Sequence, residues 1–292
     1  MKTLILCDSG LGGLDIAAPF FQKREKAEWE MIYVNAFPDP KFGYNDLADS
    51  AMQEAVFQAV LEGMERFSPA LCMIACNTLS IVWRKLSVRY RPSFPVIGII
   101  EEAVRGMTAA AQSEPDSHLL ILGTTTTVAS GVYSAALRAG GVAEDRIHSL
   151  ACPGLARLIE KDPAAPEVRQ WIAGYADRTN QLLKNREHKL YLCFCCTHYG
   201  YAEECWRQEF SRYFPLVGII NPNRLLNLPG SAASFAYRAR IELEDHQRQA
   251  MSGWFASAAP PIARALQNAQ SDDLLFRLPA GIRRKNENAF IS

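Results

Sequence analysis

The sequence predicts an α/β protein with two related halves, each a mainly parallel sheet flanked by helices. Three observations lead to this prediction. Apolar runs of strand length alternate with segments of helical spacing, a pattern typical of parallel sheets covered by helices. A stretch in the second half of the chain repeats a stretch in the first half. Each copy of the repeat carries a cysteine directly after an apolar run.

The elements of the first half follow one another in order. Thr3–Cys7 is a strand that ends in the turn DSGLGGLDIA, which leads into a helix. Met31–Val34 is a second strand, and 47–67 has the apolar spacing of a helix. Ala70–Ala75 is a buried strand, and a further helix starts after the segment 76–78.

Fewer strands and helices are predicted after residue 95 than before it. Val96–Ile100 and Leu119–Leu122 are predicted strands. Beyond residue 255 the pattern weakens, and Pro260 with Pro261 begins a short helix. The polar end of the chain is expected to be loose.

The length and charge of the chain limit its class. Its 292 residues suffice for one large domain or two of ordinary size. Hydrophobic residues make up 49% and charged residues 21%, as in soluble globular proteins. Lys and Arg total 31 and Asp and Glu total 31, so the net charge is zero. This balance argues against broad electrostatic binding to nucleic acid or to an anionic membrane.

The sequence gives no sign of a membrane segment. No apolar run approaches the roughly 18–20 residues of a membrane helix. The opening apolar stretch runs only from Leu4 to Cys7, whereas a secretory signal needs about 7–15 apolar residues. We therefore expect a cytoplasmic protein whose eight cysteines are reduced thiols.

An internal repeat aligns residues 75–100 with residues 195–220 without a gap. Cys76 matches Cys196, and both copies end in F-P-x-x-G-I-I. A looser match joins 4–10 to 120–125. Either match alone is typical of two ordinary βα units, but together they indicate two related halves that face each other.

The repeat also predicts the domain boundaries. The chain leaves the first lobe near 97–100 and returns near 217–221, so two crossings would form a hinge. We expect a first domain of residues 1–98 plus 218–255, a second domain of residues 99–217, and a C-terminal helix and tail of residues 256–292.

Each half places one cysteine at the carboxyl end of a predicted strand, where open α/β sheets bind ligands. Polar residues that begin a helix follow both Cys76 and Cys196. Helix N-termini bind carboxylates and lower the pKa of a thiol, so we expect reactive thiols here. The alternative is that both are core residues, which their matching positions argue against. Two opposed thiols suit racemisation, because one removes a proton from one face of a carbon and the other returns a proton to the opposite face.

Five motifs, in order along the chain, resemble those of the glutamate racemases of the cofactor-independent aspartate/glutamate racemase superfamily. The resemblance covers roughly residues 1–250. The motifs are DSGLGG at 8–13, ACNT at 75–78, GTTTT at 123–127 with the later Ser130 and Tyr133, ACPGLARLIE at 151–160 and CCTHY at 195–199.

The resemblance implies two pseudo-symmetric α/β domains with the active site in the cleft between them. It implies interconversion of L- and D-glutamate, which supplies D-glutamate for peptidoglycan, with Cys76 and Cys196 as the acid/base thiols and with no cofactor and no metal. Asp8, Glu160 and His198 match the groups that assist proton transfer. The residues matched to the substrate site are Asp8, Ser9, Tyr44, Asn45, Asn77, Thr78, Thr124, Thr127, Thr197 and His198. Without the resemblance, these residues have structural interpretations. Helix caps explain Asp8-Ser9 and 124–127, and His198 is then a structural histidine.

The chain departs from the family pattern at four places near the expected pocket. These differences bear on the choice of substrate side chain more than on the two-thiol chemistry. They are 42–45, Phe-Gly-Tyr-Asn where the family has Pro-Tyr-Gly; Cys195 in place of glycine; Gly200-Tyr201 in place of Pro-Leu; and Asn221 in place of a common aspartate.

Several alternatives stay open at this stage. One alternative is a related racemase for aspartate or another acidic substrate. The other is a non-catalytic binding or regulatory protein on the same scaffold. A zinc site at 193–198 is disfavoured, because a second paired cluster is absent and adjacent cysteines rarely bind one ion. His118, His148, His188 and His246 have no motif around them. The expected partner is a small amino acid, and a homodimer is one option for the assembly.

Overall fold

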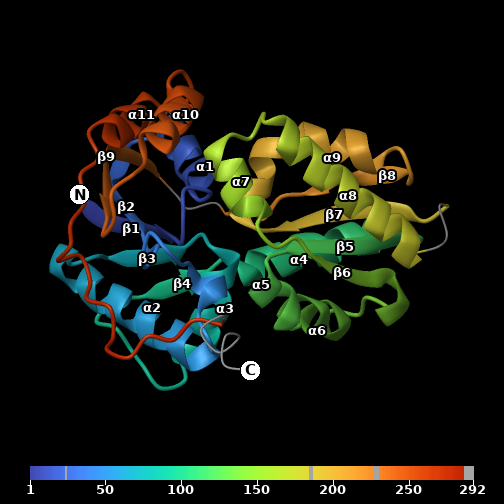
Figure 1. Ribbon diagram of the computed structural model, residues 1–292, viewed down its shortest axis with the longest axis horizontal. Helices are drawn as coiled ribbons and strands as arrows, with labels where there is room; N and C mark the ends of the chain where they lie inside the picture. The colour runs from blue at the N-terminus through green and yellow to red at the C-terminus, as the bar shows by residue number, and fades with distance from the viewer. Residues whose placement is uncertain (24, 184–186, 227–229, 286–292) are drawn as a thin grey trace, which may run out of the picture. The chain divides into compact units, whose positions relative to one another are not determined.

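Two parallel sheets organise the chain, one in each of two structural units (Figure 1). The computed structural model describes residues 1–23, 25–183, 187–226 and 230–285. The first unit comprises Met1–Gly98 and Leu228–Ser292, and the second comprises Ile99–Asn227. No helix in these described ranges is long and apolar enough to cross a bilayer.

The sheet of the first unit has the strand order β4-β3-β1-β2-β9, and neighbouring strands are parallel. The four strands expected in this half are present, and the edge strand β9 was not anticipated. The residues between Leu4 and Cys7 are fully buried, as expected for a strand covered on both faces. The bounds are β1 Lys2–Asp8, β2 Ala27–Asn35, β3 Leu71–Ile74, β4 Val96–Gly98 and β9 Ser231–Ala239.

Helices cover both faces of this sheet. Figure 1 shows α2 and α3 on one side, with α1, α10 and α11 on the other. The expected helix from residue 47 begins later, because Asp49 caps it: its Oδ1 accepts a hydrogen bond from the amide of Met52 at 2.8 Å. The bounds are α1 Leu14–Ala17, η1 Ala18–Phe21, η2 Tyr44–Asp46, α2 Ser50–Met64, η3 Glu65–Phe67, α3 Asn77–Leu86, α10 Asp245–Phe255 and α11 Pro260–Gln267.

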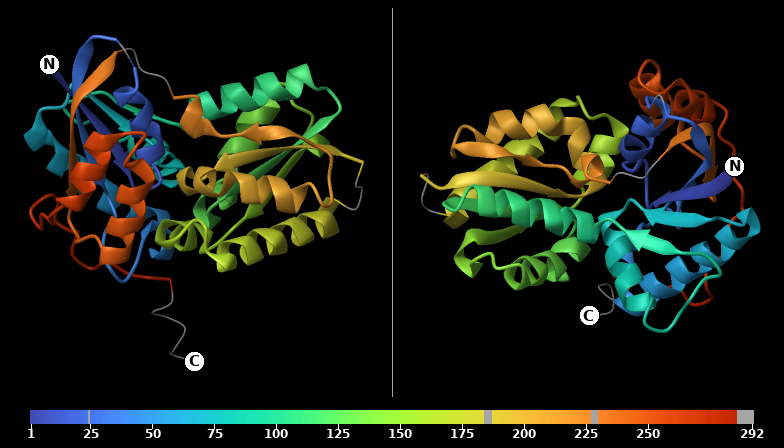
Figure 2. Two further views of the ribbon diagram at one scale, coloured as in Figure 1. Left: turned by 90° about the horizontal axis from the view of Figure 1, so that it is seen from above. Right: turned by 180° about the vertical axis from the view of Figure 1, so that it is seen from behind.

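The second unit has a parallel sheet of order β6-β5-β7-β8. Figure 2 shows its helices around this sheet in two further views. Its strands are β5 Ser117–Gly123, β6 Ile147–Ala151, β7 Lys189–Cys195 and β8 Leu216–Ile220. Its helices are α4 Ile100–Ser113, α5 Thr125–Ala129, α6 Val132–Ala139, η4 Glu144–Arg146, α7 Leu155–Lys161, α8 Pro166–Leu183, η5 Thr197–Ala202, α9 Glu203–Phe210 and η6 Pro222–Arg224.

The two units share one topology. If the first four strands of each unit are numbered in chain order, both sheets have the order 4-3-1-2. The repeated F-P-x-x-G-I-I segments form the matching strands β4 and β8. The proline of each segment accepts a main-chain hydrogen bond from the neighbouring strand. The carbonyl of Pro95 accepts from the amide of Cys72 at 2.9 Å, and that of Pro215 accepts from Leu190 at 2.9 Å. The fold class is therefore the one that the repeat predicts.

The second unit is longer than the expected residues 99–217. It extends to Asn227, because β8 pairs with β7, with Cys193 opposite Ile220. The expected start of the returning segment at residue 218 falls inside that strand, and the boundary is corrected accordingly.

Residues 256–285 are not a separate part of the fold. The helix α11 packs against α10 and β9 in the first unit. The expectation of a loose end is wrong for residues 271–285, because Leu275 and Phe276 are buried in the core of this unit. Residues 286–292 lie outside the described range.

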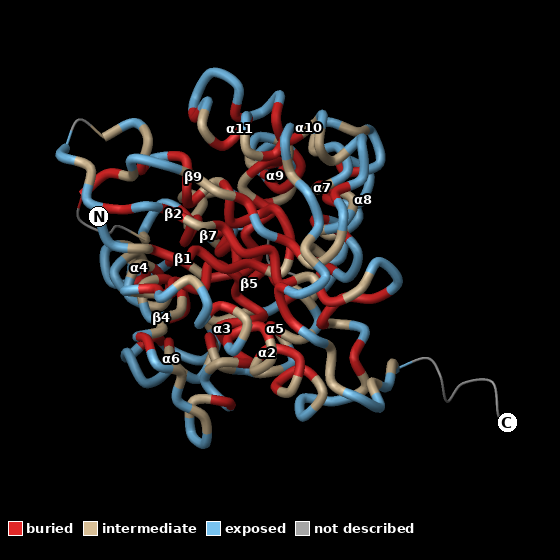
Figure 3. The backbone as a smooth tube through the Cα atoms, turned by 90° about the vertical axis from the view of Figure 1, so that its left-hand side faces the viewer, coloured by how far each residue is buried: buried red, intermediate tan, exposed pale blue. Residues whose placement is uncertain are grey.

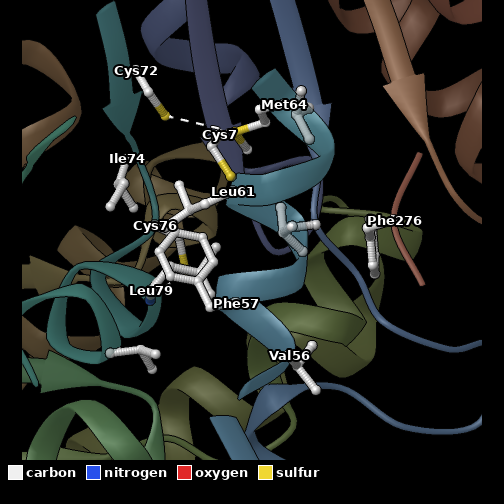
Figure 4. Close-up of a cluster of buried hydrophobic side chains, with 14 of the residues drawn as sticks. Cys7, Val56, Phe57, Leu61, Met64, Cys72, Ile74, Cys76, Leu79 and Phe276 are labelled. Carbon is white, nitrogen blue, oxygen red and sulfur yellow. Dashed lines mark hydrogen bonds between the residues drawn. The ribbon is translucent and has the colours of Figure 1, made fainter. Parts of the chain in front are cut away.

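The cores of both units lie around their central strands. Figure 3 shows β1 and β5 as buried, with exposed residues mainly on the surrounding helices and loops. In the first unit the core between the sheet and α2 includes Phe57, Leu61 and Met64. Figure 4 shows that Cys76 and Leu79, at the start of α3, belong to the same cluster. A cysteine at the end of β3 is therefore both part of this core and next to the carboxyl edge of the sheet.

Candidate active site

The first half-site, which we define by Asp8, Ser9 and Cys76, lies at the carboxyl ends of β1 and β3. In the parallel pairing, Cys7 lies opposite Ile74, so the residues that follow the two strands emerge side by side. The Ser9 Oγ atom is 3.1 Å from the Cys76 sulfur. Cys76 also caps α3, because its sulfur accepts a hydrogen bond from the amide of Leu79 at 3.5 Å.

The environment of Cys76 raises the pKa of its thiol to about 12. Burial is the main cause, and the Asp8 carboxylate adds to it; hydrogen bonds from Ser9 and from the Leu79 amide act in the opposite direction. The sequence-based expectation of a lowered pKa is therefore wrong for Cys76, because desolvation outweighs the helix N-terminus. The raised pKa keeps this thiol protonated at neutral pH.

Gly13 allows the loop after β1 to fold back against this half-site. A Cβ atom at Gly13 would lie 2.8 Å from the Cβ of Ala75 and 3.0 Å from Oδ2 of Asp8. Both distances are shorter than ordinary carbon contacts, so a side chain at this position would displace Asp8 or the end of β3. The glycine of the DSGLGG motif thus has a local packing reason.

Three further predicted residues of the first unit lie near Cys76. Asn77 and Thr78 form the first turn of α3, and each is 2% exposed. Tyr44 opens η2 and is also 2% exposed, and its hydroxyl has no hydrogen-bond partner among the described residues. Burial raises the pKa of Tyr44, and charge on Cys7 or Cys76 would raise it further, so the phenol lies near both sulfur atoms. Asn45 follows Tyr44 and is half-buried.

The second half-site, which we define by Thr124, Cys196, His198 and Glu160, lies in the second unit. Gly123 lies opposite Cys195 at the ends of β5 and β7, so Thr124 and Cys196 emerge next to each other. Thr124 caps α5: its Oγ1 accepts from the amide of Thr127 at 3.2 Å and lies 3.0 Å from the hydroxyl of Thr127. The predicted cap and the predicted substrate contact thus involve the same two threonines.

His198 connects Cys196 to Glu160. The turn η5 brings its Nδ1 to 3.8 Å from the Cys196 sulfur, and its Nε2 lies 2.5 Å from Oε2 of Glu160. Burial alone would lower the pKa of His198, but hydrogen bonds to Cys196 and Glu160 and the charge of both groups raise it well above 6.5. The positive charge of His198 therefore faces the Cys196 sulfur.

Thr197 is held in place by a residue that the sequence reasoning missed. The side-chain amide of Asn223 donates to the carbonyl of Thr197 at 2.9 Å. The Oδ1 atom of Asn221 in turn accepts from the amide of Asn223 at 3.1 Å. The dipeptide Asn221-Pro222 after β8 is a turn signal that points to this segment. Thr197 itself is 2% exposed.

The cysteine-rich segment around β7 is packed into the core. Cys193 and Cys195 are fully buried, and burial raises the pKa of both thiols. All eight cysteines of the chain are free. Within the described ranges, no three His, Cys, Asp or Glu side chains are arranged to hold a metal ion.

Three histidines without a sequence motif lie together at the opposite edge of the second sheet. His118, His148 and His188 lie at or just before the amino ends of β5, β6 and β7, whereas Cys196 follows the carboxyl end of β7. Nδ1 of His118 is 2.9 Å from Nε2 of His148, and the His118 and His188 ring centroids are 3.8 Å apart. His148 and His188 also line a cavity of about 360 Å³. This cluster is remote from the second half-site, because it occupies the other end of the strands.

Comparisons with known proteins agree with the predicted resemblance. The model of the Asp/Glu/Hydantoin racemase family matches residues 25–182. A glutamate racemase from Bacillus cereus is 30% identical over 203 residues, which span 68% of each chain. A glutamate racemase from Oceanobacillus iheyensis is 26% identical over 200 residues, again 68% of each chain.

Solved structures share the fold. A glutamate racemase isoform from Bacillus anthracis superposes with a TM-score of 0.71 at 20% identity, covering 94% of this chain and 99% of that one. The glutamate racemase from Francisella tularensis in complex with D-glutamate gives a TM-score of 0.66 at 18% identity, covering 88% and 95%. At these identities the structural likeness establishes the fold.

Proposed function

We propose that this chain, which belongs to the Asp/Glu/Hydantoin racemase family of isomerases, interconverts L- and D-glutamate by a two-cysteine mechanism. One observation carries the proposal: a buried cysteine follows each of the matching strands β3 and β7 within two residues, and each has a polar side chain at its sulfur, Ser9 at Cys76 and His198 at Cys196. The names of the relatives support glutamate as the substrate.

The reaction needs one base and one acid. A thiolate removes the α-proton of the amino acid and becomes a thiol, which leaves the electron pair on the α-carbon. The thiol of the other cysteine then donates its proton to the opposite face and becomes a thiolate. No atom is gained or lost, and the roles are exchanged for the reverse reaction. Cys76 is assigned to the α-proton of the D-enantiomer and Cys196 to that of the L-enantiomer.

The two cysteines have different environments, and this difference suits opposite roles. The raised pKa of His198 keeps a positive charge facing the Cys196 sulfur, whereas burial and the Asp8 carboxylate raise the pKa of Cys76. If a substrate ammonium binds to Asp8, it neutralises the carboxylate that raises the pKa of Cys76. Bound substrate would then allow Cys76 to act as a base.

The remaining predicted residues bind substrate in this proposal. Carboxylates of glutamate accept hydrogen bonds from neutral side chains, which hold them without adding positive charge. The donors are Ser9, Tyr44, Asn45, Asn77, Thr78, Thr124, Thr127 and Thr197. The D-glutamate formed would enter peptidoglycan synthesis in the cytoplasm, where thiols stay reduced.

A racemase for aspartate or another acidic substrate is the second candidate. The observation that favours it is the altered segment 42–45 around Tyr44 and Asn45, which lies near Cys76. Chiral analysis of a panel of amino acids decides between the substrates. Glutamate should be racemised fastest, and activity on glutamate below that on any other member of the panel would contradict the assignment.

A non-catalytic binding protein is tested by isotope exchange. In deuterated water, the wild-type protein should exchange the α-proton of glutamate for deuterium, because each turnover returns a proton from a solvent-equilibrated thiol. A folded protein that exchanges no amino acid in the panel would contradict the enzymatic proposal and favour a binding role.

A further inference from the structure

The C-terminal strap, which we define as residues 271–285, crosses the first unit from β9 to the loop before α2. It starts beside β9, where the amide of Asp272 donates to the carbonyl of Ala239 at 2.8 Å. Arg66, in η3 at the end of α2, forms an ion pair with Asp272 and donates to the carbonyl of Leu274 at 3.3 Å. Figure 1 shows the red C-terminal chain running past α2.

The middle of the strap is part of the core. Leu275 is 1% exposed and Phe276 is 2% exposed, and both belong to the cluster that includes Val56 and Met64 of α2. Figure 4 shows Phe276 next to this helix. Gly63 permits the contact, because a Cβ atom there would lie 1.9 Å from the carbonyl oxygen of Leu275. The strap is therefore anchored along α2 before it reaches the loop.

The end of the strap pairs with the loop 42–49, which carries Tyr44 and Asn45. Arg284 forms an antiparallel bridge with Leu47. Two main-chain hydrogen bonds flank the bridge. The amide of Ala48 donates to the carbonyl of Arg283 at 3.0 Å, and the amide of Lys285 donates to the carbonyl of Asp46 at 2.9 Å.

Side chains of the strap add to this pairing. The ammonium of Lys285 donates to the carbonyl of Asn45 at 2.7 Å. The Arg284 guanidinium lies 5.9 Å from the centre of the Phe42 ring. Arg283 pairs with Asp49 at 3.4 Å, but both side chains are largely exposed, so this ion pair contributes little.

We propose that the C-terminal strap is a positioning element for the substrate site: residues 283–285 hold the loop 42–49 so that Tyr44 stays beside Cys76. The idea rests on the proposed function, which assigns Tyr44 to substrate binding. The tie is local, because Tyr44 is also held by Gln53, whose side-chain amide donates to the Tyr44 carbonyl at 2.8 Å. Loss of the contacts made by residues 283–285 should therefore loosen the loop without unfolding the unit, because Leu275 and Phe276 stay in the core.

Substitution of Lys285 tests the proposal in the full-length protein. Lys285→Pro removes both the amide that donates to Asp46 and the ammonium that donates to Asn45. Lys285→Met keeps the amide and removes only the ammonium. Arg283→Gln removes an exposed ion pair and serves as the matched control. None of these residues is assigned to catalysis or to substrate binding.

Three measurements are compared across these variants. Amide hydrogen exchange of the peptide covering residues 42–49 should be fastest in Lys285→Pro, intermediate in Lys285→Met and unchanged in Arg283→Gln. The KM for glutamate should rise about three- to tenfold in Lys285→Pro, as expected for one or two lost hydrogen bonds. The kcat and the thermal midpoint should stay close to those of the wild type.

The outcomes of these measurements either support the proposal or contradict it. Unchanged exchange in Lys285→Pro, or faster exchange with an unchanged KM, would overturn it. A fall in kcat together with a fall in the thermal midpoint would show a general structural role and would overturn it too. A wild-type protein without racemisation contradicts the proposed function instead, and the exchange measurement then decides by itself whether the strap holds the loop.

Discussion

His198 is buried and pairs with the partly buried Glu160, with Nε2 of the imidazole 2.5 Å from Oε2 of the carboxylate. The other ring nitrogen faces the Cys196 sulfur at 3.8 Å. Because the two acceptors raise the pKa of His198, its positive charge persists to higher pH than in a free histidine. The pair therefore connects Glu160 on α7, through the imidazole, to the sulfur of the cysteine that follows β7.

Glu160→Gln should lower the pKa of His198, so that the positive charge beside the Cys196 sulfur is lost at lower pH. The kcat/KM for racemisation should fall about 10- to 100-fold, and the alkaline limb of its pH profile should move to lower pH. The sign follows from the raised pKa: the histidine charge is present below that pKa and is lost as the pH rises through it.

The control for this prediction is Glu209→Gln in the same unit. Glu209 is buried, and Arg169 and Arg212 pair with it at 2.8 Å each. Its loss should reduce stability without moving the pH profile. Equal profiles for Glu160→Gln and the wild type would contradict the role of the His198 pair.

Replacement of either thiol by a hydroxyl tests whether both cysteines are needed for racemisation. In Cys76→Ser and Cys196→Ser, racemisation should fall by orders of magnitude in both directions, because each turnover needs one base and one acid. The equilibrium constant between enantiomers is one, so kcat/KM must fall equally for both. Racemisation rates alone therefore do not assign the faces.

A substrate with a β-leaving group makes the assignment, because elimination needs only the first proton abstraction. Cys196→Ser should retain elimination from the D-form, and Cys76→Ser should retain it from the L-form. Near-normal racemisation in either variant would contradict the two-thiol mechanism. Equal loss of elimination from both enantiomers in both variants would contradict only the assignment of faces.

Gly13→Ala should damage the first half-site. The added methyl group would lie 2.8 Å from the Cβ of Ala75 and 3.0 Å from Oδ2 of Asp8, so the variant should lose about 1–3 kcal/mol of stability as well as activity. Gly174→Ala is the matched control. Gly174 lies inside α8, and an added methyl group there has no atom within 4 Å. This variant should gain about 0.5–1 kcal/mol. Urea unfolding and racemisation assays test both, and a harmless Gly13→Ala would refute the packing argument.

The histidine cluster of the second unit should make the protein less stable in acid. Burial is the main cause that lowers the pKa of His118 and His148, and the neighbouring histidines add to it; for His118, Arg146 lowers the pKa and Asp145 raises it. The pKa of His148 falls from 6.5 to about 4. Between these pH values the unfolded chain binds protons that the folded cluster excludes, so stability falls as the pH falls.

His148→Gln should reduce this acid sensitivity. The measurement is the free energy of unfolding in urea at pH 7 and pH 5, compared between the wild type and the variant. The wild type should lose more stability than His148→Gln over this interval. An equal or larger loss in the variant would show that other groups carry the acid sensitivity.

Much of the fold was determined by local features of the sequence. A continuous apolar run such as Leu4–Cys7 predicts a strand that is buried on both faces. The run Val96–Ile100 predicted β4, and the matched Cys76 and Cys196 predicted one cysteine after the same strand in each unit. These features are local in sequence, because strand formation and helix capping depend on neighbouring residues.

Only the tertiary structure decided the features that depend on distant residues. The strap mixes charged residues with the short apolar run 274–276, which has no period of a helix or strand, and its order depends on α2 and on the loop 42–49. The histidine cluster forms because parallel strands align the segments at 118, 148 and 188. The raised pKa of Cys76 likewise depends on how deeply the fold buries the sulfur next to Asp8. Burial and long-range pairing are properties of the packed chain, so residue type and spacing do not determine them.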